Sequence, residues 1–146
     1  MVINVEIKNK KAYFDYYITR EIEAGISLTG TEIKSIRNGS ANIKDAYGRI
    51  KNGEAFIINM YIGKYDEGNR FNHDERRTRK LLLHKKEINK INEEINQDGF
   101  TIIPLEVYFK GSNAKVKLGV CKGKHNYDKR AALKEKELKK EAKDAY

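Results

Sequence analysis

Residues 23–45 read EAGISLTGTEIKSIRNGSANIKD and decide the fold of this chain. From residue 22 to residue 28, apolar side chains alternate with polar or small ones. A period of two is typical of a half-buried strand. The alternation stops at Thr29-Gly30, so we predict that the strand ends there.

A short helix is predicted to follow this strand. Thr31 is placed to act as its N-cap, and Glu32 puts a negative charge in the first turn. Gly39 occupies a position that commonly ends helices. Ile33 and Ile36 are three residues apart and share one face. We therefore expect the helix to close over the sheet as a lid on a small barrel.

Alternating patterns predict six strands in all, at residues 13–18, 22–28, 46–51, 54–62, 100–110 and 114–121. Asn52-Gly53 lies between two of them and predicts a tight hairpin, because both residues tolerate positive φ. Pro104 indicates an edge or a bulge in its strand. Residues 84–96 show helical periodicity instead, with a stop at Gly99.

These elements predict a mainly β protein. All connections but two are short, which favours antiparallel pairing, and closing six strands removes exposed edges. Our first choice is a small OB-type antiparallel barrel at residues 1–121, with two helices packed on it. An open sheet with packed helices is the second choice.

Residues 122–146 have a different composition and are expected to form a basic C-terminal tail. They hold nine lysines or arginines against five acidic residues. Large apolar side chains are too few to dock a helix by burial, although the composition favours helix locally. We expect the tail to be disordered when free and helical inside an anionic channel.

Composition limits the class of function. The chain has 146 residues, 30 Lys and Arg against 21 Asp and Glu, and a net charge of +9. This balance favours a polyanionic partner. The single cysteine, Cys121, excludes an intramolecular disulfide and a multi-cysteine zinc site. No signal peptide or membrane-spanning run is visible, so we expect a soluble, cytoplasmic protein.

Basic residues give the clearest functional signal. Each lysine alone is more simply explained as solubilising charge, but the whole set, with nine tyrosines and five phenylalanines for stacking, favours RNA. The candidates for phosphate contact are Arg76, Arg77, Arg79, Lys80, Lys115, Lys117, Lys122 and Lys124.

Catalysis has weaker support. The three histidines are scattered, and no phosphate-binding glycine loop is present. Four loop carboxylates, Asp66, Glu67, Asp74 and Glu75, leave a metal-dependent nuclease open as a rival, although acidic clusters in polar loops are usually solvated. We expect no enzymatic activity, no metal and no cofactor.

Five blocks resemble the SmpB family of tmRNA-binding proteins and occur in that family's order. They are NKKA (9–12), EAGISLTGTEIKSIRNG (23–39), RKLLLH (79–84), KVKLGVCKGK (115–124) and YDKR (127–130). The resemblance implies the same OB-type fold and binding to the tRNA-like domain of tmRNA. It implies that Glu23 and Leu82 bind this RNA, and that Asn9, Tyr16 and Lys115 also contribute to the contact. Without it, Glu23 would be taken as an ordinary solvent-facing strand residue.

The resemblance also implies a role for the tail. Tyr127, Asp128, Lys129 and Arg130 match the element that acts in the ribosomal decoding centre, with the following tail in the mRNA channel. Many members carry His where this chain has Tyr127, and Tyr can stack but cannot bear an imidazolium charge. Delivery to stalled ribosomes would involve elongation factor Tu and GTP. A general OB-type binder of single-stranded nucleic acid remains the alternative.

Overall fold

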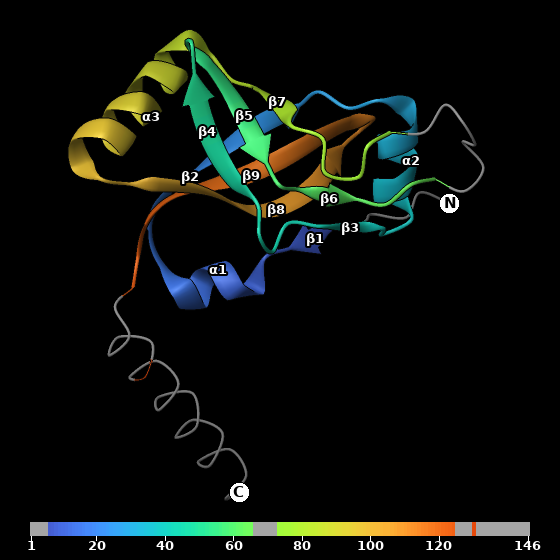
Figure 1. Cartoon of the computed structure of the whole chain (residues 1–146), viewed down its shortest axis with the longest axis horizontal. Coiled ribbons are helices and arrows are strands. Elements are labelled where there is room, and N and C mark those ends of the chain that lie inside the picture. Colours follow the sequence, from blue (N-terminus) through green and yellow to red (C-terminus); the bar gives the residue numbers. More distant parts are fainter. Residues whose placement is uncertain (1–5, 66–72, 125–129, 131–146) are drawn as a thin grey trace, which may run out of the picture.

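The computed structural model describes residues 6–65, 73–124 and Arg130 (Figure 1). Within these residues it contains three helices, α1 Lys10–Asp15, α2 Gly30–Arg37 and α3 Lys85–Asp98. The strands are β1 Ile7–Lys8, β2 Tyr16–Ile26, β3 Ala41–Asn42, β4 Tyr47–Lys51, β5 Glu54–Ile58, β6 Tyr61–Ile62, β7 Arg79–Leu82, β8 Thr101–Lys110 and β9 Asn113–Gly123.

Seven strands form one antiparallel sheet in the order β1-β8-β9-β2-β7-β5-β4, while β3 and β6 pair separately. The sheet curls so that β4 packs against β8, where a Cβ added to Gly48 would lie 2.7 Å from Ile102. Aliphatic side chains from the inner face, including Ile57, Val116 and Leu118, are fully buried. The predicted mainly β class and small OB-like architecture are confirmed.

Several predicted details are also confirmed. Asn52 and Gly53 have φ of 53° and 74°, as a tight hairpin between β4 and β5 requires. The pairing register of β8 with β9 shifts between Pro104 and Glu106, which places a bulge at the proline. Gly39 and Gly99 adopt left-handed conformations at helix ends.

Other details were wrong. Residues 13–15 end the helix α1 instead of starting a strand, because the Asn9 side chain caps this helix by accepting from the Ala12 N–H at 3.2 Å. The strand β7 was not predicted. The N-cap of α2 is Thr29 and not Thr31, since Thr29 and Glu32 form a reciprocal capping box. Lys122 and Gly123 still pair with β2, so β9 runs two residues past the predicted end at 121.

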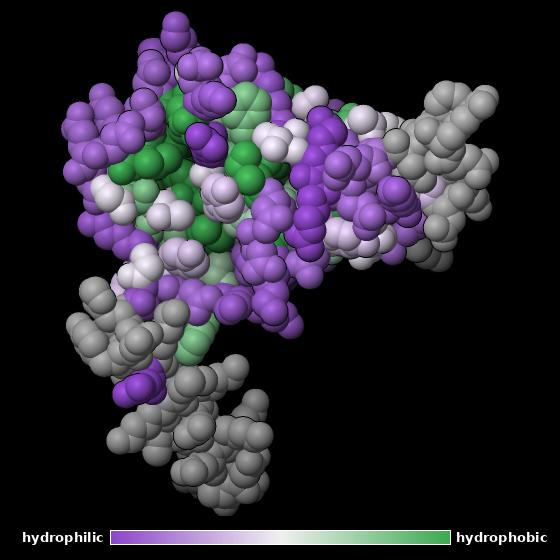
Figure 2. Space-filling view, viewed as in Figure 1, coloured by the Kyte–Doolittle hydropathy of each residue, from purple (hydrophilic) through white to green (hydrophobic). Residues whose placement is uncertain are grey.

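The long helix α3 covers one end of the curled sheet. Its isoleucines Ile88 and Ile91 are buried in the main core, and Ile95 packs against it. Figure 2 shows hydrophobic residues gathered beside α3 and β4, surrounded by hydrophilic ones. The predicted apolar stripe is therefore the face that docks α3.

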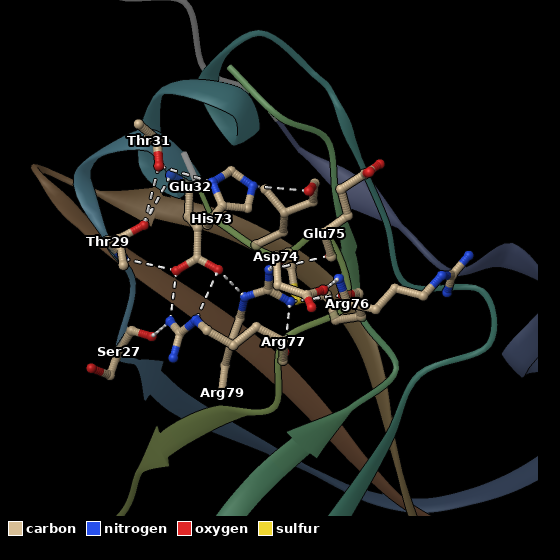
Figure 3. Close-up of polar contacts among 12 residues, drawn as sticks. Ser27, Thr29, Thr31, Glu32, His73, Asp74, Glu75, Arg76, Arg77 and Arg79 are labelled. Carbon is tan, nitrogen blue, oxygen red and sulfur yellow. Dashed lines mark hydrogen bonds and ion pairs between the residues drawn. The ribbon is translucent and has the colours of Figure 1, made fainter. Parts of the chain in front are cut away.

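A buried charge network joins α2 to β7 and to the segment that precedes it (Figure 3). The side chains of Glu32 and Arg79 are both 0% exposed. The carboxylate of Glu32 accepts from the Thr29 N–H at 2.8 Å, from Arg77 Nη2 at 2.6 Å and from Arg79 Nε. Each carboxylate oxygen of Glu32 is therefore occupied within the fold.

The guanidinium of Arg79 uses all its N–H groups inside the protein. Besides Glu32, it donates to the carbonyls of Met60 at 2.7 Å, Arg77 at 3.0 Å, Glu75 at 3.3 Å and Asp74 at 3.4 Å. Arginine has five such donors, so none is left for an external ligand. Arg79 therefore joins four backbone carbonyls and one carboxylate by hydrogen bonds to a single buried guanidinium.

The pKa of Glu32 reflects this environment. Burial favours the neutral acid and raises the pKa, but the hydrogen bonds from Arg77, the Thr29 N–H and Arg79 outweigh it and lower the pKa from 4.5 to about 2. The Glu32 carboxyl therefore binds a proton less readily in the folded protein than in the unfolded chain. Its contribution to stability, on the order of 3 kcal/mol, is complete above pH 4.5 and is lost as the pH falls towards 2.

We predict that Glu32→Gln lowers the free energy of unfolding at pH 7 by about 3–5 kcal/mol, because two arginines lose their buried counter-charge. Between pH 4.5 and 2 the difference from the unsubstituted protein should shrink. Urea unfolding followed by circular dichroism at several pH values measures both effects. Glu54→Gln is the matched control, since Glu54 pairs with Lys80 at 3.2 Å but its side chain is 50% exposed. This control should change stability by less than about 1 kcal/mol, and equal losses in the two variants would contradict the prediction.

Candidate RNA interface

On the outer face of the sheet, Gly25 lies where the sequence blocks 23–39, 79–84 and 115–124 come together. In the strand register it pairs with Leu82 of β7 on one side and with Lys115 of β9 on the other. Glu23 lies two residues earlier in β2, on the same face. We name this surface the Gly25 face and define it by Glu23, Gly25, Leu82, Tyr108, Lys110, Lys115 and Lys117.

The absence of a side chain at residue 25 shapes this surface. A Cβ added there would lie 3.2 Å from the Cβ of Leu82 and 3.4 Å from its Cδ1. Leu82 fills part of that space and is nevertheless 54% exposed. The glycine therefore allows a large apolar side chain to lie over the strand and face solvent.

The carboxylate of Glu23 is held in place by β8. Tyr108 donates its hydroxyl to Oε2, and Lys110 donates to Oε1 at 3.1 Å. These two hydrogen bonds, with the charges of Lys110 and Lys115, lower the pKa of Glu23. Burial, and then the bond to Glu23, raises the pKa of Tyr108. Glu23 thus presents an oriented, ionised carboxylate that can accept further hydrogen bonds.

Acidic neighbours partly neutralise the predicted lysines. Lys117 lies 3.6 Å from Glu106 and 3.9 Å from Glu21, and Lys80 pairs with Glu54. Lys115 has no carboxylate within 4.0 Å among the residues that the structure describes. Lys115 is therefore the best-placed cation on this face for a phosphate.

Two residues that were predicted to contact RNA, Arg79 and Asn9, are buried in the structure. Arg79 was assigned to phosphate binding, but its guanidinium is enclosed by Glu32 and four carbonyls. Asn9 is 4% exposed, and its amide donates to the carbonyls of Pro104 at 3.1 Å and Ile43 at 3.3 Å. Neither side chain can touch RNA in this conformation. Asn9 instead positions α1 against the sheet.

Three further predicted residues, Tyr16, Lys122 and Lys124, lie away from the Gly25 face, near the start of β2 and the end of β9. Tyr16 packs on the small cluster of Ala12, Ile103, Leu105 and Cys121 and lines a pocket of about 270 Å³. Lys122 pairs in register with Tyr17, and Lys124 lies close beyond it. The structure therefore does not bring Tyr16, Lys122 and Lys124 together with the residues of the Gly25 face.

Some predicted residues lie outside the described chain. These are Tyr127, Asp128 and Lys129, the tail from residue 131, and the loop carboxylates Asp66 and Glu67. Arg130 is described and exposed. Among residues 6–65, 73–124 and 130, no group of three or more His, Cys, Asp or Glu could hold a metal ion.

Tyr108 and Lys110 belong to the site but were missed. A signal existed, because a two-residue turn at Gly111-Ser112 pairs Lys110 with Asn113 and therefore Tyr108 with Lys115. The predicted strands at 100–110 and 114–121 left three residues between them, which would pair Lys110 with Ala114, so the observed pairing of Tyr108 with Lys115 was missed by one residue. Their approach to Glu23 also required knowing that β9 pairs with β2.

Known proteins resemble this chain over almost its entire length. The family model for the SmpB protein matches residues 6–146. An SsrA-binding protein of Staphylococcus aureus (strain JH1) is 58% identical over 134 residues, covering 92% of this chain and 87% of that protein. An SsrA-binding protein of Shouchella clausii (strain KSM-K16) is 55% identical over 141 residues, covering 97% of this chain and 90% of its own length.

A solved structure is also similar. It is described as "tmRNA-SmpB: a journey to the center of the bacterial ribosome" and superposes with a TM-score of 0.71 at 40% sequence identity. The match covers 88% of this chain and 94% of the solved chain. The likeness therefore extends to the arrangement of the whole described fold.

We predict that Tyr108→Phe raises the pKa of Glu23 towards its ordinary value, because the carboxylate loses a hydrogen bond that favours its charged form. Carboxyl-carbon NMR titration measures this directly. Tyr47→Phe removes the hydroxyl of an exposed tyrosine on β4 and should leave Glu23 unchanged. An unaltered Glu23 titration in Tyr108→Phe would show that Tyr108 does not hold this carboxylate.

Proposed function

The chain belongs to the SmpB family, and on this premise we propose that it binds the tRNA-like domain of tmRNA in trans-translation. It delivers this RNA to stalled ribosomes, so that incomplete polypeptides are tagged and the ribosomes are rescued. The observation that carries the proposal is the convergence of Glu23, Leu82 and Lys115 around Gly25. These three residues come from three of the five sequence blocks that resemble the family.

Three residues of the Gly25 face offer three different kinds of contact to RNA. Lys115 can neutralise a phosphate and release a counterion. Leu82 offers an exposed apolar surface to a ribose or an unstacked base. Glu23 repels phosphate but can accept hydrogen bonds from base amino and imino groups. A surface with these three groups selects a folded RNA with a base edge exposed beside its backbone.

The mixed charge of this face argues against the general single-stranded binder. Such proteins use positively charged grooves with successive aromatic platforms. Here Lys117 and Lys110 are paired with glutamates, and Tyr108 is the aromatic residue of the face, with its hydroxyl engaged by Glu23. Selective recognition of one RNA shape fits this arrangement better.

The C-terminal segment has a separate role in the proposal. Tyr127, Asp128, Lys129 and Arg130 act in the decoding centre of the small ribosomal subunit. Because β9 runs to Gly123, the tail of the proposal begins after Lys124 instead of at residue 122, and it becomes helical in the empty mRNA channel. Elongation factor Tu with GTP accompanies the tmRNA complex. The body therefore extends to residue 124, and the protein works in the cytoplasm as a binding protein and not as an enzyme.

The described helices are too short or too polar to cross a membrane.

We predict that Glu23→Ala and Leu82→Ala each weaken binding of the tRNA-like domain. The loss for Glu23→Ala should be about tenfold or more, because a hydrogen bond to a charged group contributes roughly 1.5–3 kcal/mol. Fluorescence titration of the labelled RNA domain at one fixed salt concentration measures the affinity. Unchanged affinity in both variants would contradict the proposed contact.

The matched control replaces Asp128, Lys129 and Arg130 together by alanine. Affinity for the isolated RNA domain should stay within about twofold, whereas tagging on stalled ribosomes in a purified translation system should be abolished. Equal loss of binding and tagging would contradict the division between body and tail.

A further inference from the structure

The guanidinium of Arg77 has one edge that the fold does not use. Its Nε and Nη2 donate to the two carboxylate oxygens of Glu32, at 3.4 Å and 2.6 Å, and Nη2 also donates to the Ser27 carbonyl at 3.4 Å (Figure 3). Within the part of the chain that the structure describes, Nη1 has no hydrogen-bond acceptor. The side chain is 38% exposed. Both N–H groups of Nη1 are therefore available to a ligand from outside the protein.

Glu32 holds this guanidinium in a single orientation. The carboxylate is fully buried and is itself fixed by the Thr29 N–H at 2.8 Å and by Arg79. Bonds from both Nε and Nη2 define the plane of the Arg77 guanidinium and turn its other edge away from Glu32. A donor that is already oriented loses less entropy when it binds a ligand. Arg77 is therefore prepared for an acceptor that matches its fork.

The three charges of this network leave a positive excess at Arg77. One carboxylate, that of Glu32, faces two guanidiniums, those of Arg77 and Arg79. The Arg79 side chain is 0% exposed, so among these three residues only Arg77 presents its charge to solvent. Lys80 differs, because its ammonium pairs with one glutamate, Glu54, at 3.2 Å. The ligand that fits Arg77 is therefore an anion, and the oxygens of a phosphate match the guanidinium fork.

Arg77 lies at the end of the Gly25 face that is opposite Glu23. The Ser27 N–H donates to the Lys80 carbonyl at 2.9 Å, which continues the pairing of β2 with β7 past Gly25. Positions 23, 25 and 27 share one face of the extended chain, and Ser27 lies roughly 7 Å beyond Gly25. An RNA strand that follows β2 across this face can thus place a base edge near Glu23 and its backbone within reach of Arg77.

We propose that Arg77 binds a phosphate of the RNA at the Gly25 face and that Glu32 is the positioning residue for its guanidinium. The phosphate accepts from Nη1, and also from Nη2 when it displaces the Ser27 carbonyl, whose distance of 3.4 Å marks a weak bond. This contact rests on the proposed function and adds a phosphate anchor to the residues that define the face. The network that holds α2 on the sheet then also orients an RNA contact.

The experiment measures the affinity of full-length variants for the labelled tRNA-like domain at several salt concentrations. Arg77→Ala removes the guanidinium, and Arg77→Gln removes its charge but keeps a donor for Glu32. Arg49→Ala is the matched control, because Arg49 is exposed on β4, and β7 and β5 lie between β4 and β2. Leu82→Ala is the uncharged control on the face itself. Circular dichroism checks the fold of each variant, in which Arg79 still neutralises Glu32.

We expect Arg77→Ala and Arg77→Gln to weaken binding about tenfold or more at low salt, the loss that one hydrogen bond to a charged group predicts. The slope of log affinity against log salt should become shallower by about 0.7–0.9, because one phosphate contact is lost. Arg49→Ala should bind within about twofold of the unsubstituted protein, with the same slope. Leu82→Ala should lose affinity without a change in slope, since leucine neutralises no phosphate.

An unchanged slope in both Arg77 variants would overturn the proposal, because a purely structural role of Arg77 alters stability and not counterion release. An equal change of slope in Arg49→Ala would also overturn it, since net charge would then explain the result. If Leu82→Ala binds normally, the proposed function of the Gly25 face fails instead, independently of the slope measured for Arg77.

Arg77→Lys tests the positioning by Glu32. Lysine keeps the charge, but it cannot pair side-on with Glu32 and present a fork to a phosphate as well. We expect the affinity to fall about threefold or more below that of the unsubstituted protein, with little change in slope. Full affinity in Arg77→Lys would show that charge alone acts and would overturn the positioning role of Glu32.

Discussion

The buried ion pair between Glu32 and Arg79 is the constraint on which the proposed RNA surface depends. Burying two charges is unfavourable unless they are paired and fully hydrogen-bonded, and here both groups are satisfied within the fold. Strand side chains alternate between faces, and in β7 Arg79 and Leu81 are buried while Lys80 and Leu82 face outward. Fixing Arg79 inside therefore sets Leu82 outside, opposite Gly25.

The outer face shows why charge alone does not describe this protein. The chain carries +9 overall, yet the glutamates at positions 21, 23 and 106 hold or flank the lysines of the Gly25 face. Screened and partly neutralised cations contribute modest affinity. In the proposed contact, selectivity comes from the oriented Glu23 carboxylate and from Leu82, and long-range attraction comes from the remaining basic surface and the tail.

Patterns of neighbouring residues were enough to predict those elements that depend only on their own stretch of sequence. The Asn52-Gly53 hairpin, the α3 stripe and the bulge at Pro104 all follow from neighbouring residues. The burial of Arg79 could not be predicted, because residues 76–80 look like a solvated cationic run and the partner Glu32 lies 47 residues earlier. The same holds for Tyr108 and Glu23, which are 85 residues apart. The family resemblance identified Glu23, Leu82 and Lys115, and only the strand register brings them together.

Photo-cross-linking in a complete complex tests the central claim, that the Gly25 face of the sheet contacts the tRNA-like domain of tmRNA. A benzophenone amino acid is placed at position 82 or at position 17, and the protein is bound to tmRNA on a stalled ribosome. We predict that position 82 cross-links to the tRNA-like domain and that position 17, at the other end of β2, does not. Cross-links to the tRNA-like domain from position 17 alone, or from neither position, would contradict the account.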